Sequence, residues 1–371
     1  MRLKRIIKWA VLLIFVALIA WLFVGYWMST NDCEQITKTP THPMKAILLC
    51  EYGAQNLRLN EIEKPIPANN EVLVRVRAAS LNPADGHMIR DSWLARLFSG
   101  LRKPRNTRFG TDFAGVVETV GKDVTDFKAG DEVFGAKNGA ISDYICVKAE
   151  RAIALKPANI TFEQAGSVGI AGLTALQGLR DKGHLQAGQK VLINGASGGV
   201  GTFAVQIAKA FGAEVTAVCS TRNVDLVKSI GADHVVDYTK EDFTKTDQHY
   251  DLIYDLVSNH GFSERRKILT PNGICVLAGI GGAGFHPGTM GRIVANFWNA
   301  FRSNFTKQKF VFYIAKLTKE DFAVMRDLMQ SGKVSPVIDR TYKMEQTADA
   351  VRYMEEGHAR GKVVVEVTSG V

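Results

Sequence analysis

The stretch that decides the fold is Val191-Leu192-Ile193-Asn194-Gly195-Ala196-Ser197-Gly198-Gly199-Val200-Gly201. It runs from a short apolar segment, typical of a buried strand, into a glycine-rich turn. The residues after the turn place apolar side chains at helical spacing, at Val200, Phe203, Ala204, Ile207, Ala208 and Phe211, before Gly212 ends the helix. A second apolar segment follows at 215–219. The sequence therefore predicts a strand, helix and strand unit over residues 191–218.

The turn has the composition of a phosphate-binding loop. Residues without a bulky side chain let backbone amides approach a ligand, and the motif here is Ala-x-Gly-x-x-Gly at Ala196, Gly198 and Gly201. The helix begins at the turn, so its unpaired N–H groups and positive dipole end face the same point. A dinucleotide pyrophosphate is predicted to contact Gly195, Ala196, Ser197, Gly198, Gly199, Val200 and Gly201. The alternative is a tight turn that binds no ligand.

The end of the second strand indicates which dinucleotide binds. An NAD site would present Asp or Glu there to the ribose 2′-hydroxyl, but this chain has Cys219-Ser220-Thr221-Arg222. A carboxylate would repel a 2′-phosphate, whereas Ser220 and Arg222 can donate hydrogen bonds and Arg222 adds a positive charge. We therefore predict NADP(H) as the cofactor. The alternative for Arg222 is an ordinary solvated residue in a loop.

The remaining sequence divides into domains. The 371 residues are enough for two or three. From residue 167 to 311 short apolar strands alternate with helices, which predicts a doubly wound α/β domain with a parallel sheet; its strands are expected at 191–194, 215–219, 234–237, 252–255 and 274–278. Residues 44–166 are expected to be mostly β, because polar and apolar residues alternate at 71–77 and β-branched residues cluster at 115–120. Helices are expected near 321–332 and 346–356, and a last strand at 362–367.

The N-terminal part is predicted to lie in a membrane. Residues 9–27 contain no charge, and a helix of that length nearly matches a hydrocarbon core of about 30 Å. A cleaved signal peptide is the alternative, but its apolar region usually spans about 7–15 residues and ends at small residues, whereas this run closes on Gly25-Tyr26-Trp27-Met28. We expect residues 1–28 to form a single-pass anchor and the polar residues 29–43 to form a flexible linker.

Charge and cysteine content limit the partners and the compartment. The formal net charge is +9, but Arg2, Lys4, Arg5 and Lys8 precede the apolar run, and what remains does not indicate a nucleic-acid-binding protein. The cysteines lie far apart and without metal-ligand spacing, at Cys33, Cys50, Cys146, Cys219 and Cys275. This pattern predicts free thiols in a reducing compartment.

The two indications of membrane orientation disagree. Positive charges ahead of residue 9 predict a cytoplasmic N terminus, with the globular part on the other side of the membrane. NADPH and free thiols instead favour a reducing, cytosol-like side. We favour a catalytic domain that faces the cytoplasm.

Further motifs give residues 44–367 a specific family resemblance. They are Ala79-Ser80-Leu81-Asn82-Pro83-Ala84-Asp85, Gly110-Thr111-Asp112-Phe113-Ala114-Gly115, FKAGDEVFG at 127–135, AGLTA at 171–175 and ARGKVV at 359–364. With the glycine turn, they resemble the zinc-independent, quinone-oxidoreductase-like branch of the medium-chain dehydrogenases/reductases. The nearest pattern is that of the reticulon-interacting and chloroplast-envelope quinone oxidoreductase homologues.

The resemblance implies a GroES-like β-barrel domain, completed by residues 312–371, packed on a Rossmann domain with the active site in the cleft between them. By family pattern, Asn82 and Asp85 are the catalytic residues near the nicotinamide, and Thr174 meets the nicotinamide side. Ser220, Arg222 and Tyr238 surround the 2′-phosphate. Without the resemblance, Asn82 reads as a turn or capping residue before Pro83, and Tyr238 as a surface residue at the end of a strand.

The departures from the zinc-dependent relatives matter for the reaction. Those relatives carry a cysteine near Ala84 or Asp85, a Gly-His-Glu motif at the place of 110–112, and a four-cysteine lobe that is missing here. We therefore expect no metal site. Without a Lewis acid, alcohol oxidation loses its main means of stabilising an alkoxide, whereas hydride addition to a polarised C=C bond or a quinone needs less. Asn82 is the leading candidate for a donor that orients the substrate.

Two stretches interleave apolar and basic residues, at 93–105 and at 292–310. By the family pattern both lie near the mouth of the cleft, and their composition suits a membrane surface. We expect them to admit a small lipophilic substrate. The alternative is core packing or contact between the subunits of a homodimer.

The sequence thus predicts an NADP(H)-dependent reductase of activated alkenes or quinones. A membrane-tethered NADPH-binding adaptor or sensor with little turnover is the alternative, since a fold does not guarantee its chemistry. An alcohol dehydrogenase is a lesser one.

Overall fold

The computed structural model describes residues 23–90, 96–97, 99–278 and 289–367 and, nearer the N terminus, residues 9, 16–17 and 20–21. Most of the predicted anchor at 1–28, and residues 93–95 and 98 of the first amphiphilic stretch, lie outside this set. Within the part of the chain that the structure describes, no helix is both long and apolar enough to cross a membrane. The described residues 23–28 include large exposed apolar side chains, among them Phe23, Trp27 and Met28.

The first unit is mostly β, as its alternating sequence predicts, and all of its strand pairs run antiparallel except residues 338–343 with residues 362–366, which pair in parallel. Strand β1 (Pro43–Leu49) pairs with β2 (Leu57–Glu63). A larger sheet has the order β14-β15-β3-β4-β5-β7, with β6 paired to β3. Its strands are β3 (Glu71–Leu81), β4 (Asp112–Val120), β5 (Glu132–Ala136), β6 (Tyr144–Lys148), β7 (Ile153–Leu155), β14 (Ile338–Lys343) and β15 (Lys362–Glu366). The antiparallel pairing of β15 with β3 brings the C-terminal segment into this sheet.

The second unit is a parallel six-stranded sheet of order β10-β9-β8-β11-β12-β13. Its strands are β8 (Lys190–Asn194), β9 (Glu214–Cys219), β10 (His234–Asp237), β11 (Tyr250–Asp255), β12 (Leu269–Leu277) and β13 (Lys309–Phe312). The order reverses at β8, which is the doubly wound arrangement that the sequence predicts. The five predicted strands are confirmed, whereas β13 was not expected.

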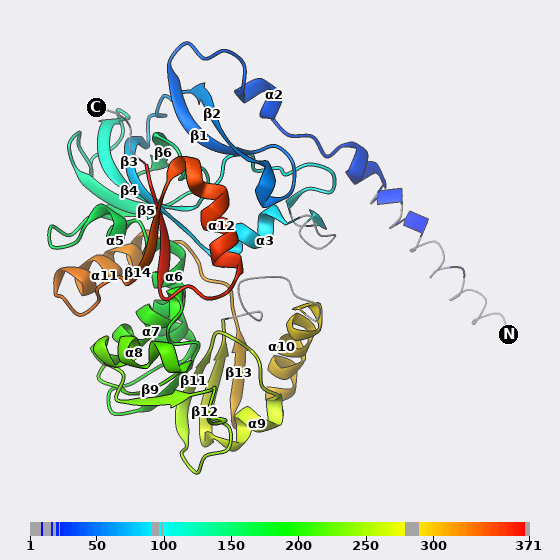
Figure 1. Cartoon of the computed structure of the whole chain (residues 1–371), viewed down its shortest axis with the longest axis vertical. Helices are drawn as coiled ribbons and strands as arrows, with labels where there is room; N and C mark the ends of the chain where they lie inside the picture. The colour runs from blue at the N-terminus through cyan, green and yellow to red at the C-terminus, as the bar shows by residue number, and fades with distance from the viewer. Residues whose placement is uncertain are drawn as a thin grey trace.

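Helices cover both units and connect them (Figure 1). They are α2 (Cys33–Ile36), α3 (Pro83–Ile89), α5 (Phe162–Ala165), α6 (Gly169–Gln177), α7 (Gly199–Ala210), α8 (Val224–Ser229), α9 (Phe262–Lys267), α10 (Thr289–Ser303), α11 (Lys319–Gln330) and α12 (Thr347–Glu355). Single turns occur at η1 (Ala54–Asn56), η2 (Gly178–Lys182), η3 (Thr221–Asn223) and η4 (Met344–Gln346). Because crossovers between parallel strands are right-handed, α7 and α8 cover one face of the parallel sheet and α9 and α10 the other.

One hydrophobic core joins the two units. Ala114 of β4 and Phe134 of β5 belong to the same buried cluster as Val191 of β8 and Phe203 of α7. Phe322 of α11 packs its ring against the ring of Phe134, with 5.5 Å between ring centroids. A shared core of this kind fixes the position of the β-rich unit relative to the glycine turn.

Residues 29–36 lie against the first unit and do not form a free linker. Cys33, on α2, forms a disulfide with Cys50 at the end of β1, with 5.8 Å between the two Cα atoms. Asn31 donates its side-chain amide to the Cys50 carbonyl at 2.9 Å, and Thr107 donates its hydroxyl to the Asp32 carboxylate at 2.7 Å. The buried Ser29 hydroxyl accepts the backbone N–H of Arg102 at 3.1 Å. These contacts hold residues 29–33, which directly follow the predicted membrane anchor, against the β-rich first unit.

The prediction of five free thiols is wrong for two of them. Cys33 and Cys50 are far apart in the sequence, but α2 folds back onto the end of β1 and brings their side chains into bonding distance. Cys146, Cys219 and Cys275 are free and buried. Burial raises the pKa of the Cys275 thiol to about 12, so this thiol stays protonated and unreactive.

Candidate active site

The glycine turn is built to bring backbone close to a ligand. Gly195 has a φ angle of +91°, a backbone conformation that residues with a Cβ atom rarely adopt. A Cβ on Gly201 would come within 2.1 Å of the Gly195 carbonyl oxygen, so helix α7 can pack against the turn only with glycine there. Ala196 is fully buried, whereas residues 197–200 are partly accessible at the start of α7. The turn therefore has the features that pyrophosphate binding requires, and the predicted residues fit this group.

The end of β9 is connected to this turn by a residue that the sequence did not single out. Asn223 donates its side-chain amide to the Ser197 hydroxyl at 2.9 Å and to the Ser220 hydroxyl at 3.2 Å. Asn223 is buried, and its amide fixes the positions of Ser197 and Ser220, the two serines predicted to contact the cofactor. Its role depends on a contact across the turn, for which the local sequence contains no signal.

Arg222 and Tyr238 lie at the same edge of the sheet. Arg222 is exposed, and its guanidinium donates to the His358 carbonyl oxygen at 2.9 Å. Tyr238 follows β10, its backbone N–H donates to the Cys219 carbonyl at 3.0 Å, and its side chain is exposed. The structure thus brings Ser220, Arg222 and Tyr238 to one strand edge.

A carboxylate also lies at this edge, at Asp237. Its oxygens accept hydrogen bonds from the Thr221 hydroxyl at 2.5 Å and the Thr239 hydroxyl at 2.7 Å. The hydrogen bond from Thr221 is the largest cause that lowers the pKa of Asp237, to about 2. Asp237 ends β10, whereas the ribose-binding acid of an NAD site follows the preceding strand, β9, where this chain has Ser220.

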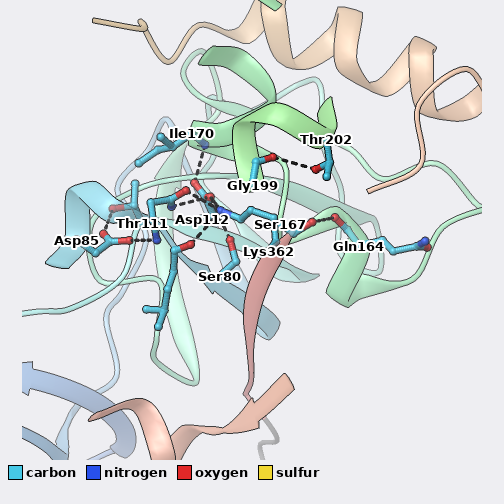
Figure 2. A network of polar contacts seen from close by, with 12 residues as sticks. Ser80, Asp85, Thr111, Asp112, Gln164, Ser167, Ile170, Gly199, Thr202 and Lys362 are labelled. Carbon is cyan, nitrogen blue, oxygen red and sulfur yellow. Dashed lines mark hydrogen bonds and ion pairs between the residues drawn. The ribbon is translucent and has the colours of Figure 1, made fainter. Parts of the chain in front are cut away.

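A buried polar cluster lies on the other side of the turn (Figure 2). Its centre is Asp112, at the first position of β4 and without solvent exposure. One carboxylate oxygen accepts from the Asn82 amide at 2.9 Å and from the Ser80 hydroxyl at 3.1 Å. The other accepts the backbone N–H of Ile170, in the first turn of α6, at 2.9 Å. Asp112 therefore ties β3, β4 and α6 together at the boundary of the two units.

Lys362, on β15, places a cation in this cluster. Its Nζ donates to the Asn82 side-chain oxygen at 2.6 Å and lies 3.4 Å from the Asp112 carboxylate. Burial lowers the pKa of this lysine, while Asp112 and Asp85 oppose the shift. A Cβ on Gly199 would lie 3.1 Å from the Lys362 Cδ, so the lysine stem passes directly beside the cofactor turn. Lys362 thus connects the cluster to the predicted pyrophosphate site.

Asn82 and Asp85 meet at the start of α3. Asn82 is the N-cap residue, and its backbone N–H donates to the Asp85 carboxylate at 2.8 Å. The second Asp85 oxygen accepts from the Thr111 hydroxyl at 2.9 Å. Burial, followed by the charge of Asp112, raises the pKa of Asp85 to about 6. This carboxyl can therefore gain or lose a proton near neutral pH.

Asn82 is both a helix-capping residue and a member of the buried polar cluster. The residue caps α3, and its side chain also connects Asp112 to Lys362. Asn82 is only 1% exposed, so its amide is directed into the cluster. That geometry suits a positioning residue better than a donor that touches the substrate.

Thr174 lies on α6, between the two units, and is partly buried. Its carbonyl oxygen accepts a hydrogen bond from the Tyr254 hydroxyl at 2.9 Å and another from the Tyr313 hydroxyl. Burial raises the pKa of Tyr254 well above its usual range. The two tyrosines fix the backbone of α6 at the position where the family pattern places the nicotinamide.

No metal centre is formed by the described residues, in which no group of three or more His, Cys, Asp or Glu side chains could hold an ion. Zinc independence itself rests on the missing ligand motifs and stays a prediction.

Comparison with known proteins places this geometry in a family. The profile described as "Alcohol dehydrogenase GroES-like domain" matches residues 68–204, and the profile described as "Zinc-binding dehydrogenase" matches residues 230–365. The mitochondrial NAD(P)H oxidoreductase RTN4IP1 of Bos taurus is 33% identical over 87% of this chain and 89% of its own length. The chain belongs to the medium-chain dehydrogenase/reductase family.

Two other members of the medium-chain dehydrogenase/reductase family bear on the branch. The chloroplastic NADPH-dependent alkenal/one oxidoreductase of Arabidopsis thaliana is 33% identical over 91% of this chain and 83% of its own length. The solved structure of the quinone oxidoreductase from Coxiella burnetii superposes with a TM-score of 0.74 at 29% identity, covering 88% of this chain and all of that one. The predicted fold, a GroES-like unit with a parallel-sheet Rossmann unit, and the quinone-oxidoreductase-like branch are thereby confirmed.

Proposed function

We propose that this protein is an oxidoreductase that uses NADP(H) to reduce an activated alkene or a quinone without a zinc ion. The observation that carries the proposal is the buried cluster of Asn82, Asp112 and Lys362 beside the Gly199 turn. Relatives named as NAD(P)H and NADPH-dependent oxidoreductases support the cofactor, and relatives named for alkenals and quinones support the substrate class.

The chain's own residues supply binding and proton control. The turn at 195–201 would hold the pyrophosphate, and Ser220, Arg222 and Tyr238 would hold the 2′-phosphate. When bound, the cofactor supplies a hydride, and the reduced acceptor must then gain a proton. Asp85, with a pKa of about 6, is the group in the cluster whose proton affinity matches neutral pH. Asn82 and Lys362 fix its surroundings.

The substrate class follows from what the site can stabilise. A polarised C=C bond or a quinone needs only a hydride and a proton, and the cluster holds a carboxyl, Asp85, that can exchange a proton near neutral pH. A simple alcohol would need a Lewis acid to help it lose its proton. The proposed substrates are therefore small lipophilic enones, 2-alkenals or quinones.

The test is a turnover assay on the full-length protein. NADPH absorbance is followed with a panel of quinones, 2-alkenals and simple ketones, and we expect NADPH to be oxidised with the quinones or the alkenals and much more slowly with simple ketones. Tight NADPH binding without oxidation by any member of the panel would favour the adaptor or sensor. Alcohol oxidation that depends on added zinc would overturn the proposal.

We also propose that residues 9–27 anchor the protein in a membrane, from their length, their lack of charge and the basic residues ahead of them. The disulfide between Cys33 and Cys50 removes two of the five thiols that favoured a cytoplasm-facing catalytic domain, and the three free thiols are buried. That disulfide and the N-terminal charges both favour the opposite orientation. Protease accessibility in intact cells tests this, because digestion from the outside is expected only in that orientation.

A further inference from the structure

Helix α10 (Thr289–Ser303) is inverted relative to an ordinary surface helix. Among the α10 side chains that the structure describes, the buried ones are polar: Asn296, Asn299 and Ser303 are each no more than 7% exposed. Its outward side is apolar. We call this side the α10 aromatic face; its members are 52–78% exposed and are Val294, Phe297, Trp298, Phe301 and Phe305, which follows the helix. A helix that faces water has the reverse distribution.

The rings of the α10 aromatic face contact one another. Trp298 stacks on Phe301 with 5.4 Å between ring centroids, and Phe301 meets Phe305 at 5.6 Å. Phe297 contacts Phe312 of β13 at 5.2 Å, which extends the apolar surface onto the edge strand of the parallel sheet. Soluble monomers rarely leave a continuous surface of this kind in water, because exposing it costs roughly 25 cal/mol per Å².

The charge of the same segment indicates what covers the face. The sequence from residue 289 to 310 contains Arg292, Arg302, Lys307 and Lys309 but no Asp or Glu. Arg302 lies over the ring of Phe262, 4.6 Å from its centroid, and Lys307 and Lys309 are exposed next to Phe305. Aromatic side chains bordered by cations are the composition of a segment that lies in the headgroup region of an anionic bilayer.

We propose that the α10 aromatic face docks on an anionic lipid surface, with its rings at the boundary between headgroups and acyl chains. Figure 1 draws α10 on the side of the molecule toward which the described N-terminal residues extend. The hydrogen bonds of Ser29 and the disulfide of Cys33 hold those residues against the barrel, so a nearby bilayer would lie at a fixed orientation. This surface goes beyond the proposed function and does not depend on turnover.

A second copy of the chain is the competing occupant, because β13 is an open edge strand next to the face. In a symmetric dimer the same patch of both subunits would meet. Lys307 and Lys309 would then need acidic partners on the other copy, and the segment from 289 to 310 contains none. Cations left without such partners oppose association, whereas anionic lipids neutralise them.

The experiment places spin labels on the full-length protein in lipid nanodiscs. The single substitutions Phe301→Cys and Phe305→Cys each provide an exposed thiol, while the three native free cysteines are buried and do not compete for the label. Accessibility to oxygen relative to an aqueous nickel complex is measured by power saturation. In nanodiscs containing phosphatidylglycerol we expect this ratio to rise by about threefold or more over lipid-free protein, as for side chains that enter the acyl region.

Controls separate the face from the rest of the molecule. Ile66→Cys carries the label at an equally apolar residue, 90% exposed on the barrel, and should stay in water. A variant that combines Lys307→Gln and Lys309→Gln with the Phe301→Cys label tests the role of charge. Its ratio of oxygen to nickel accessibility should fall toward the value measured in pure phosphatidylcholine. High salt should do the same without any substitution, because it screens the attraction.

Two results would overturn the proposal. Labels at 301 and 305 that remain as accessible to the nickel complex as the label at 66 would show that the face does not enter lipid. Dipolar broadening between labels, with elution at twice the monomer mass, would show that a second copy covers it. Both results are independent of NADPH oxidation, so they are distinguishable from failure of the proposed function.

Discussion

At the scale of single residues, the site depends on partners that are distant in the sequence. Asp112 and Lys362 both stand within motifs that carried the family resemblance, yet no role was predicted for either. Lys362 lies 280 positions from Asn82, and its hydrogen bond to that residue exists only because β15 pairs with β3. Motifs predict which residues matter, whereas contacts between strands from opposite ends of the chain require the fold.

Replacing Lys362 by Met should impair catalysis, and it should also lower stability because the buried Asp112 carboxylate loses its cation. The substitution keeps the stem beside Gly199 but removes the cation that lowers the pKa of Asp85. We expect kcat to fall by about 10- to 100-fold, with a smaller change in KM for NADPH, and the pKa in the kcat/KM profile to move upward. The matched control is Lys156→Met, another lysine with a buried side chain, which donates to the Ile160 carbonyl away from the cluster. Equal losses in both variants would contradict a role in the site.

Asp85 should make stability depend on pH. Its folded pKa of about 6 exceeds the ordinary value of 3.8, so the folded state holds more protons than the unfolded state between these values. The free energy of unfolding should therefore fall as pH rises through this window, by about 3 kcal/mol from this group. Denaturant titrations at several pH values should show a shallower fall for Asp85→Asn, with Asp247→Asn, at an exposed position, as the control. An unchanged slope in Asp85→Asn would refute the assignment.

At the scale of elements, local patterns predicted regular structure well and missed what depends on packing. The strand expected at 234–237 is β10 with the same bounds, and the helix expected at 346–356 is α12, Thr347–Glu355. Strand β13 was not predicted because its four residues, Lys309–Phe312, continue an amphiphilic stretch and become a strand only beside β12. The outward orientation of the apolar face of α10 could not be predicted either, because periodicity shows that a helix has an apolar face but not whether that face points to the core or to solvent.

The turn after β9 should determine cofactor preference. Arg222→Ala removes the exposed cation at the strand edge, and we expect KM for NADPH to rise by about 10- to 100-fold while KM for NADH changes little. Steady-state kinetics with both cofactors measure this. Arg326→Ala, an arginine on α11 that pairs with the neighbouring Asp327, is the control and should leave both constants in place. Parallel losses for NADPH and NADH would mean that Arg222 acts through its bond to His358 and not through the 2′-phosphate.

At the scale of the whole molecule, the disulfide changes how the parts are joined. The sequence suggested a globular protein on a loose tether, because residues 29–43 are polar and rich in Thr and Pro. The structure instead fastens their first half to the barrel through Cys33, Asn31 and Ser29. Cysteine spacing alone does not reveal such pairing, because it depends on how α2 folds back.

Counting the reactive thiols tests whether the disulfide between Cys33 and Cys50 forms. Denatured, unreduced protein should react with a maleimide at three cysteines and reduced protein at five, because Cys146, Cys219 and Cys275 are free while Cys33 and Cys50 are joined. The bond closes a loop of sequence separation 17, so reduction should lower the free energy of unfolding by about 3 kcal/mol. Cys33→Ser should already be destabilised and insensitive to reductant. Five reactive thiols before reduction would show that the bond does not form.

The pinned segment also has a consequence for how the enzyme would meet its substrate. If residues 9–27 cross a bilayer, the chain leaves it at a point rigidly connected to the barrel, and the active site stays at one height above the lipid. A lipophilic acceptor dissolved in the membrane would then arrive by lateral diffusion within a plane, and rates would scale with its density per membrane area and not with its concentration in solution.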